Sequence, residues 1–216
     1  MNKIQLLSVA LLPLIFAITV HEAAHGWVAN KLGDPTARKM GRLTFNPIPH
    51  IDPIGTILVP MVMLFLGGFI FGWAKPVPVN VRNFAEPRKD MAVVALAGPG
   101  SNFLMALMWG LIWRVTYFLP VSTEWVAVPL LLMAQVGVFL NLILMVLNLL
   151  PLPPLDGSRV LTWLLPPALA EKVDQIEPYG IFILLGLLYV GLWGAVISPV
   201  TGFFSNLIQH LFFLGG

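Results

Sequence analysis

Long apolar runs constrain this chain more than any other feature of its 216 residues. About 20 apolar residues are enough to cross the hydrocarbon core of a bilayer. Residues 4–31, 92–119, 126–150 and 181–197 form such runs, the last of them slightly short. A chain with segments this apolar uses lipid as the solvent for most of its length, so we expect helices that span a membrane.

The composition agrees with this interpretation. Hydrophobic residues make up 58% of the chain, charged residues make up 10%, and the mean hydropathy is +0.87. A soluble domain averages roughly 25% charged residues. Because no polar linker or internal repeat divides the chain, we expect one domain over residues 1–216. The predicted fold class is an all-α polytopic membrane protein with about four spanning helices.

The first apolar run resembles a signal peptide, because Lys3 precedes the apolar residues from Ile4 to Val20. No clear cleavage site of small residues follows, and the run continues directly into His21. We therefore expect an uncleaved spanning helix over residues 4–31.

Residues 54–73 are long enough to span but are interrupted by Pro60 and by Gly67–Gly68. We expect this segment to enter the membrane and return to the same side, as a re-entrant segment or a β-hairpin. Residues 38–45 are predicted to form a short strand. The apolar tail over residues 199–216 contains polar residues, so we expect an interfacial or partly inserted helix there.

The distribution of basic residues favours a re-entrant segment. If residues 54–73 crossed the membrane, the twelve Lys and Arg residues would divide seven against five between the two sides. If the segment returns, ten lie on one side, and only Lys3 and Arg114 lie on the other. Basic residues concentrate on the cytoplasmic side of membrane proteins. We therefore expect the N-terminus outside and both flanking loops in the cytoplasm.

His21 and His25 stand four residues apart, so on a helix they share one face, one turn apart. Two such imidazoles can bind one zinc ion, and Glu22 beside them can reach a metal-bound water. The same pattern also occurs by chance as a solvated turn in unrelated helices. Here it follows an apolar run, and ionisable residues at membrane depth are costly and usually functional. The pattern therefore favours a zinc site.

A catalytic zinc ion takes a third protein ligand, and a chain without cysteine must supply it from His, Asp or Glu. Asp156 is the strongest candidate, because three prolines stop the preceding helix and Gly157 permits a sharp turn. The same Asp-Gly pair is also common as a helix-capping turn. His50, close to Asp52 in a proline-rich loop, remains an alternative third ligand.

Two asparagines lie in otherwise apolar segments. Asn148 lies two helical turns before Asp156, and it is predicted to donate a hydrogen bond to the oxyanion of the reaction. Asn102 follows small residues that permit close helix approach, so we expect it to serve in packing. Each can instead be a simple interhelical hydrogen-bonding residue.

These motifs together resemble the site-2 protease family of intramembrane metalloproteases. The matching residues are HEAAH over residues 21–25, GWAKPVPVN over 72–80, GPGSN over 98–102, and the segment from Asn148 to Gly157. The likeness spans residues 20–160 in the order found in the family. It is specific as a set.

The resemblance implies a zinc peptidase that acts on membrane-anchored proteins, often in regulated intramembrane proteolysis. The resemblance also implies one Zn²⁺ per chain, with His21, His25 and Asp156 as ligands and Glu22 as the catalytic acid/base. The expected partners are a transmembrane protein substrate and the lipid bilayer, with no nucleic acid. We expect a cell-membrane protein with its active site near the cytoplasmic face, and no PDZ or CBS module within these residues.

Two other functions are compatible with a zinc site in a membrane. A zinc transporter should offer metal sites at several depths, whereas the candidate ligands here form one set that includes Glu22. A structural membrane protein that has lost activity should show an altered His, Glu or Asp, and none is altered.

Overall fold

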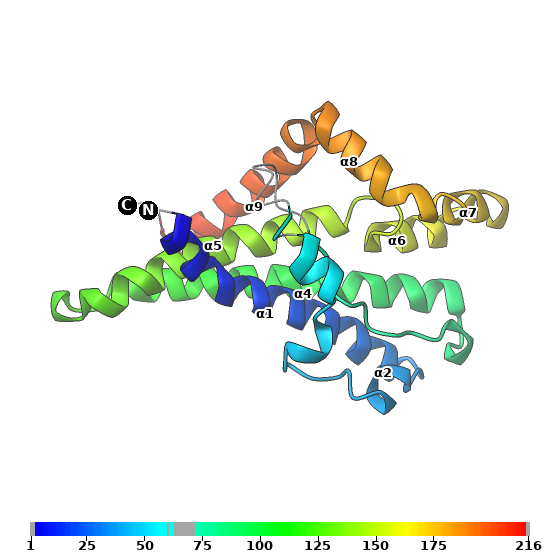
Figure 1. Cartoon of the computed structure of the whole chain (residues 1–216), viewed down its shortest axis with the longest axis horizontal. Helices are drawn as coiled ribbons and strands as arrows, with labels where there is room; N and C mark the ends of the chain where they lie inside the picture. Colours follow the sequence, from blue (N-terminus) through cyan, green and yellow to red (C-terminus); the bar gives the residue numbers. More distant parts are fainter. Residues whose placement is uncertain (1–2, 60, 63–71, 215–216) are drawn as a thin grey trace.

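Three long helices form the centre of the protein (Figure 1). The computed structural model describes residues 3–59, 61–62 and 72–214. The central helices are α1 (Lys3–Lys31), α4 (Pro87–Thr116) and α5 (Glu124–Asn148), and α4 packs against both of the others. Four segments are long and apolar enough to cross a membrane, at residues 8–31, 87–116, 121–148 and 167–190. The prediction of about four spanning-length helical segments is confirmed.

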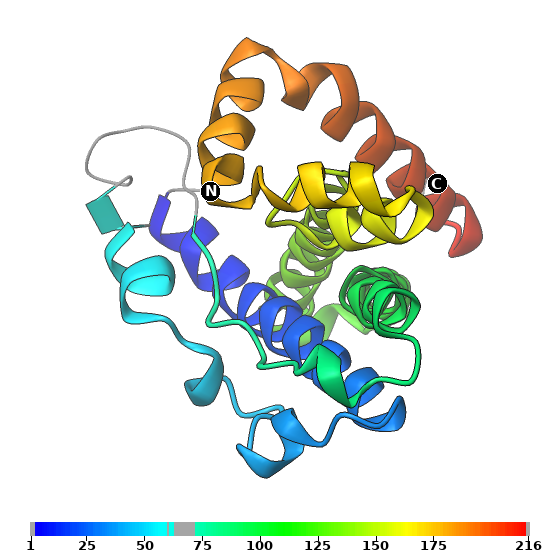
Figure 2. The ribbon, with the colours of Figure 1, turned by 90° about the vertical axis from the view of Figure 1, so that its right-hand side faces the viewer.

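Shorter elements surround this bundle. In Figure 2, α8 and α9 lie on the side of the bundle opposite the loops that follow α1. In chain order the shorter elements are α2 (Thr36–Lys39), η1 (Ile48–His50), η2 (Pro53–Leu58), η3 (Val81–Asn83), η4 (Val121–Thr123), α6 (Asp156–Leu164), α7 (Pro167–Asp174), η5 (Glu177–Tyr179), α8 (Gly180–Val190), η6 (Trp193–Ile197) and α9 (Ser198–Leu211).

The helix α4 runs antiparallel to both of its long neighbours. Its first turns pack against the end of α1 through Val94 and Ala29, and further along Asn102 reaches back to Ala17. The same Asn102 bonds to Asn141 of α5, and later residues of α4 meet earlier residues of α5. It follows that α1 and α5 run parallel, as Figure 1 shows. The end of α1 and the start of α4 therefore lie at the same end of the bundle.

The ends of the central helices follow from local sequence. Pro87 occupies the first turn of α4, where its missing N–H costs nothing. The Asp90 carboxylate accepts a 2.9 Å hydrogen bond from the Glu86 amide and so satisfies one donor at that end. At the other boundary, Pro151 and the prolines after it prevent α5 from continuing beyond Asn148.

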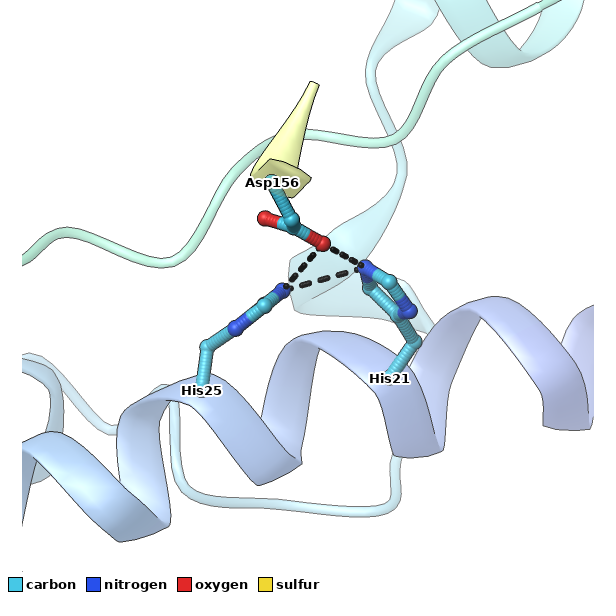
Figure 3. Close-up of side chains that lie close together, drawn as sticks. All are labelled: His21, His25 and Asp156. Atoms are coloured by element: carbon cyan, nitrogen blue, oxygen red, sulfur yellow. Dashed lines mark hydrogen bonds and ion pairs between the residues drawn. The ribbon is translucent and has the colours of Figure 1, made fainter. Parts of the chain in front are cut away.

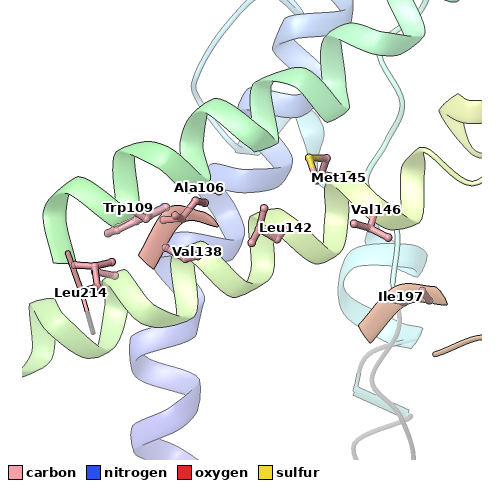
Figure 4. Packing of buried hydrophobic residues seen from close by; sticks show 10 residues of the cluster. Ala106, Trp109, Val138, Leu142, Met145, Val146, Ile197 and Leu214 are labelled. Carbon is pink, nitrogen blue, oxygen red and sulfur yellow. The ribbon is translucent and has the colours of Figure 1, made fainter. Parts of the chain in front are cut away.

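The main core lies between α4, α5 and the C-terminal segment (Figure 4). Gly137 of α5 brings the helices close, because a Cβ there would lie 2.5 Å from the Trp109 ring of α4. In lipid, helix association depends on such close van der Waals packing, since lipid tails are as apolar as the side chains. The buried residues of this cluster are Ala106, Trp109, Ala134, Val138, Leu142, Met145, Val146, Ile197, Ile208 and Leu214.

The strand predictions are wrong where the structure describes the chain. Residues 38–45 begin within helix α2 and continue as turns, without strand pairing. Residues 53–58 form the π-helix η2, and helical backbone includes 59 and 61–62, so this part of the 54–73 segment is not a β-hairpin. Asp52 explains the helical start, because its carboxylate caps η2 by accepting from two backbone amides. Residues 63–71 lie outside the described part of the chain.

The structure also refines the description of three other segments. The expected span 181–197 is not one helix, because α8 ends at Gly191, whose φ of +113° is a left-handed conformation that favours glycine. Helix α9 packs against α4 and α5 and buries Ile208, so this part of the tail is a packed helix of the bundle. Asp156 begins the short helix α6 instead of ending the preceding long helix.

An extended segment, residues 72–80, runs alongside the second half of α1, and we call it the strap. Hydrogen bonds to residues outside it hold it in place. The Lys75 amide donates to His50 O (2.9 Å), and Lys75 O accepts from the Arg42 guanidinium (2.8 Å). The Val77 amide donates to Glu22 Oε2 (2.8 Å), and the Asn80 amide donates to Asp34 Oδ2 (2.7 Å). These bonds fix the position of the strap along α1.

Asp34 anchors the end of this strap from a fully buried position. Burial by itself would raise the pKa of the Asp34 carboxyl. Hydrogen bonds from Thr36, Asn80 and Asn83 outweigh that effect and hold the pKa below its ordinary value of 3.8. A carboxyl with a lowered folded-state pKa stabilises the fold above its unfolded pKa, and this stabilisation is lost as the pH falls through the folded pKa.

We expect Asp34→Asn to destabilise the protein at neutral pH by about 2 kcal/mol, because an amide NH₂ then faces groups that donate. The wild type should lose this advantage as the pH falls below 3.8, whereas the variant has no such carboxyl to protonate. Apparent thermal midpoints in detergent at pH 7 and at acidic pH measure the difference. Exposed Glu171, changed to Gln, is the control, and an equal pH response in both variants would contradict the assignment to Asp34.

Candidate metal centre

Three ligand atoms from two distant parts of the chain meet beside α1 (Figure 3). The Nε2 atoms of His21 and His25 are 3.0 Å apart. Oδ2 of Asp156, the first residue of α6, lies 3.2 Å from Nε2 of His21 and 3.4 Å from Nε2 of His25. No other cluster of three potential metal ligands of this kind occurs among residues 3–59, 61–62 and 72–214.

The other nitrogen of each imidazole is already engaged. Nδ1 of His25 lies 2.7 Å from the Val94 carbonyl oxygen, which can only accept, so this nitrogen carries the proton. Nδ1 of His21 lies 2.6 Å from Oδ1 of Asn102 and donates in the same way. In the neutral rings, both Nε2 atoms therefore present lone pairs toward Asp156.

The third atom of the cluster is an acceptor as well. Asp156 contributes a carboxylate oxygen, and an ionised carboxylate can only accept. Oδ2 of Asp156 is buried and has no hydrogen-bond partner. Two lone pairs and one carboxylate oxygen thus converge without a donor between them. This donor set fits a divalent cation, and two imidazoles with one carboxylate form a ligand set typical of catalytic zinc.

Gly98 of α4 makes room for the two imidazoles. A Cβ at this position would lie within 2.5 Å of ring atoms of both His21 and His25. Only a residue without a side chain lets α4 approach α1 this closely at the height of the cluster. Gly98 belongs to the 98–102 motif, although the sequence alone did not assign it this steric role.

A cavity of about 500 Å³ opens beside the cluster. Its wall combines His21 and Glu22 with Asn148 of α5 and with apolar side chains of several elements, among them Leu184 of α8. Trp73 and Pro76 of the strap line the same space. Glu22 therefore lines the same cavity as His21, on the side of the ligand cluster where a fourth, non-protein ligand would enter.

The predicted site residues are placed as follows. His21, His25 and Asp156 lie together, and Glu22 and Asn148 line the cavity beside them. One amide hydrogen of Asn148 is used within its own helix, on Leu144 O at 2.9 Å, and its role at the oxyanion remains a prediction. His50 is buried elsewhere, with Nε2 3.1 Å from Thr44 O, and belongs to no such ligand cluster in the described chain.

Sequence reasoning missed two features of the site. Asn102 was expected to serve in packing, yet it also bonds directly to a ring nitrogen of His21. Asn141, which bonds to Asn102, was not singled out at all. A signal was available, because Asn141 lies two helical turns before Asn148 in an apolar helix, and a buried amide there needs a partner.

A bundle with helices of spanning length, joined by a His/His/Asp cluster and a glutamate in a shared cavity, defines a membrane metalloprotein of hydrolase type. The chain is 40% identical over 217 residues to a Bacillus subtilis (strain 168) protein named "Putative zinc metalloprotease YwhC", covering 97% of this chain and 93% of that protein. It is 27% identical over 202 residues to proteins named "Putative zinc metalloprotease Rip2" from Mycolicibacterium smegmatis and Mycobacterium tuberculosis, covering 94% of this chain and 72% of each. The chain belongs to this family of zinc metalloproteases, and its cofactor is zinc.

No protein-family model matches the chain, and no solved structure gives a significant match. The family assignment therefore rests on the sequence relatives, and the geometry of the site rests on the structure described above.

We expect Gly98→Ala to weaken zinc binding at least about tenfold, because the added methyl group displaces the imidazoles from their common point. Gly100→Ala on the same helix is the matched control, since a Cβ there meets nothing within 4 Å. Zinc content after purification and competition with a chelator measure the affinity. Equal affinities of the two variants would show that Gly98 does not shape the site.

Proposed function

We propose that this protein is an intramembrane zinc protease of the site-2 protease type. It hydrolyses peptide bonds in or near transmembrane segments of membrane-anchored proteins, in regulated intramembrane proteolysis. The observation that carries the proposal is the position of the His21–His25 pair within a helix of spanning length, beside a cavity that also contains Glu22. A metal hydrolase site at that place in the chain meets substrates that are themselves in or close to the bilayer.

The residues of this chain divide the catalytic work. His21, His25 and Asp156 hold the zinc ion, which when bound acts as a Lewis acid and lowers the pKa of water to roughly 7. Glu22 takes the proton of the attacking water and later transfers it to the leaving amine. Asn148, at the other wall of the cavity, donates its remaining amide hydrogen to the oxyanion.

The strap positions the catalytic base. The Val77 amide holds Oε2 of Glu22 at 2.8 Å, which leaves Oε1 as the oxygen that accepts the proton. Because Asp34, Arg42 and His50 fix the strap on either side of this contact, the Glu22 carboxylate keeps a defined orientation. A preoriented base lowers the reorganisation required during the reaction.

The substrate must present an unwound segment. A transmembrane helix hides its carbonyl groups in backbone hydrogen bonds, so helix-breaking Gly or Pro residues near the cut make cleavage easier. Residues 38–45, predicted as a short strand, and the described part of 54–73, predicted as a re-entrant segment or hairpin, form no strand to which a substrate could add. The extended backbone of the strap, which lines the cavity through residues 72–74 and 76, is the element along which we place an unwound substrate.

We further propose a cell-membrane location with the site near the cytoplasmic face. Two observations support this topology. The end of α1 and the start of α4 lie at one end of the bundle, which favours a connection that begins and ends on the same side of the membrane. Ten of the twelve basic residues lie in the segments expected at that end, whereas Lys3 and Arg114 lie toward the other.

We expect Glu22→Gln to abolish peptide cleavage and to leave zinc content unchanged, because Glu22 is the base and not a ligand. Asp156→Ala should lower zinc content as well as cleavage, because it removes one of three ligands. Purified protein in detergent is tested for bound zinc and for cleavage of a panel of single-span substrates. Normal turnover by Glu22→Gln would refute the mechanism, and a metal-loaded wild type that cleaves no single-span substrate would refute the substrate class.

The absence of native cysteine allows a direct test of the topology. Single cysteines at exposed Lys39 and Glu86 should react alike with an impermeant maleimide, only after the cells are permeabilised. A cysteine at exposed Ser122, in the turn at the opposite end of the bundle, should react in intact cells. Reaction of only one of the first two positions in intact cells would mean that the intervening segment crosses the membrane.

A further inference from the structure

Two buried asparagines connect the three central helices to the metal cluster. Asn102 of α4 and Asn141 of α5 are both fully buried, within segments long enough to span a membrane. Buried amides in an apolar bundle are costly unless they are hydrogen-bonded. Their hydrogen bonds therefore indicate what they do.

Backbone carbonyl groups fix the direction of this hydrogen-bond chain. Nδ2 of Asn141 donates to Gly137 O at 2.9 Å, within its own helix. Oδ1 of Asn141 consequently faces α4, where it accepts from Nδ2 of Asn102 at 3.0 Å. Nδ2 of Asn102 also donates to Ala17 O of α1, at 3.2 Å. Both of its hydrogens are thus used on acceptors, so the orientation of the Asn102 amide is set.

That orientation determines what His21 can do. Oδ1 of Asn102 accepts the Nδ1 proton of His21 over 2.6 Å, so the lone pair of the neutral ring is at Nε2, which faces Asp156. A reversed Asn102 amide would turn its NH₂ toward His21 and its oxygen toward two acceptors. Each buried polar group left unsatisfied in this way costs about 1–3 kcal/mol.

His25 provides an internal comparison. Its Nδ1 is held by a main-chain carbonyl, Val94 O, which no side-chain substitution removes directly. Of the two imidazoles, therefore, His21 is the one whose tautomer depends on side chains that belong to other helices. This difference makes the contribution of the two asparagines separable by mutation.

We propose that Asn102 and Asn141 are positioning residues for zinc binding. Asn102 fixes the tautomer and ring orientation of His21, and Asn141 fixes the orientation of Asn102. The ligand geometry on α1 is thereby coupled to the docking of both α4 and α5. This inference rests on the zinc cofactor and not on intramembrane cleavage, because its test measures zinc affinity.

The test compares substitutions that remove the same interhelical bonds but differ toward His21. Asn102→Leu loses the acceptor for Nδ1, and it should weaken zinc binding by about 10–100-fold. Asn102→Asp retains an acceptor oxygen, although it loses the amide hydrogens donated to Asn141 and Ala17. Its zinc affinity should stay within about threefold of the wild type, since carboxylate–histidine pairs also orient zinc ligands.

The second pair of variants tests the outer residue. Asn141→Asp keeps an oxygen that accepts from Asn102 and should retain zinc affinity, whereas Asn141→Leu should lose about tenfold. Ser101→Ala is the control, because Ser101 neighbours Asn102 and bonds only to Gly98 O of its own helix. Affinity is measured by titrating zinc into metal-free protein against a chelator, and the thermal midpoint of the metal-free protein reports the helix packing.

A purely structural role makes a different prediction. If the asparagines only join the helices, Asn102→Asp and Asn102→Leu lower the thermal midpoint together and bind zinc equally. That result, or an unchanged affinity in Asn102→Leu, would overturn the proposal. If Asn102→Leu does not fold, the comparison of the two Asn141 variants decides, and equal zinc affinities there would overturn it. ¹⁵N NMR of histidine in the metal-free protein should show the His21 proton on Nδ1 in the wild type and a mixture of tautomers in Asn141→Leu.

Discussion

Mutual repulsion among three acceptor atoms is the constraint on which the site depends. Two imidazole lone pairs and one carboxylate oxygen lie within 3.4 Å of one another, in surroundings that offer no donor between them. In a medium of low polarity such a group is unstable without a cation. Favourable packing of the helices offsets the repulsion among these atoms in the metal-free protein. Zinc binding removes that repulsion and so stabilises the fold.

Small residues make that packing possible. Gly98 lets α4 approach the two histidines, and Gly137 lets α5 receive the Trp109 ring of α4. A bilayer supplies little hydrophobic force between helices, so close backbone approach and interhelical hydrogen bonds have to hold the bundle. The Asn102–Asn141 bond is such an interaction, and it ends on a ligand of the metal. In this protein the same contacts serve helix association and ligand geometry.

Much of this arrangement could be predicted from the sequence, because long apolar runs and regular residue spacing determine it. Apolar runs of spanning length predicted the central helices, and the four-residue spacing of His21 and His25 placed both on one helix face. The grouping with Asp156 needed the motif set, because nothing local links residues so far apart. The failed predictions concern short, irregular segments. Residues 38–45 contain Gly41 and one β-branched residue, Thr44, whereas residues 54–62 combine several β-branched residues with Gly55 and Pro60. Capping by Asp52, together with tertiary contacts, decided for helix and turn. The positioning role of Asn102 was missed because it depends on three helices at once.

The parallel arrangement of α1 and α5 has a consequence for how the protein is made. The two histidines enter the membrane with the first helix, whereas Asp156 follows only after α4 and α5 have been synthesised. In a bilayer, transmembrane helices insert before they associate with one another. During synthesis the nascent chain therefore carries an incomplete metal site, with two ligands waiting for the third. A chain that ends before α6 lacks Asp156 and cannot assemble the three-ligand centre.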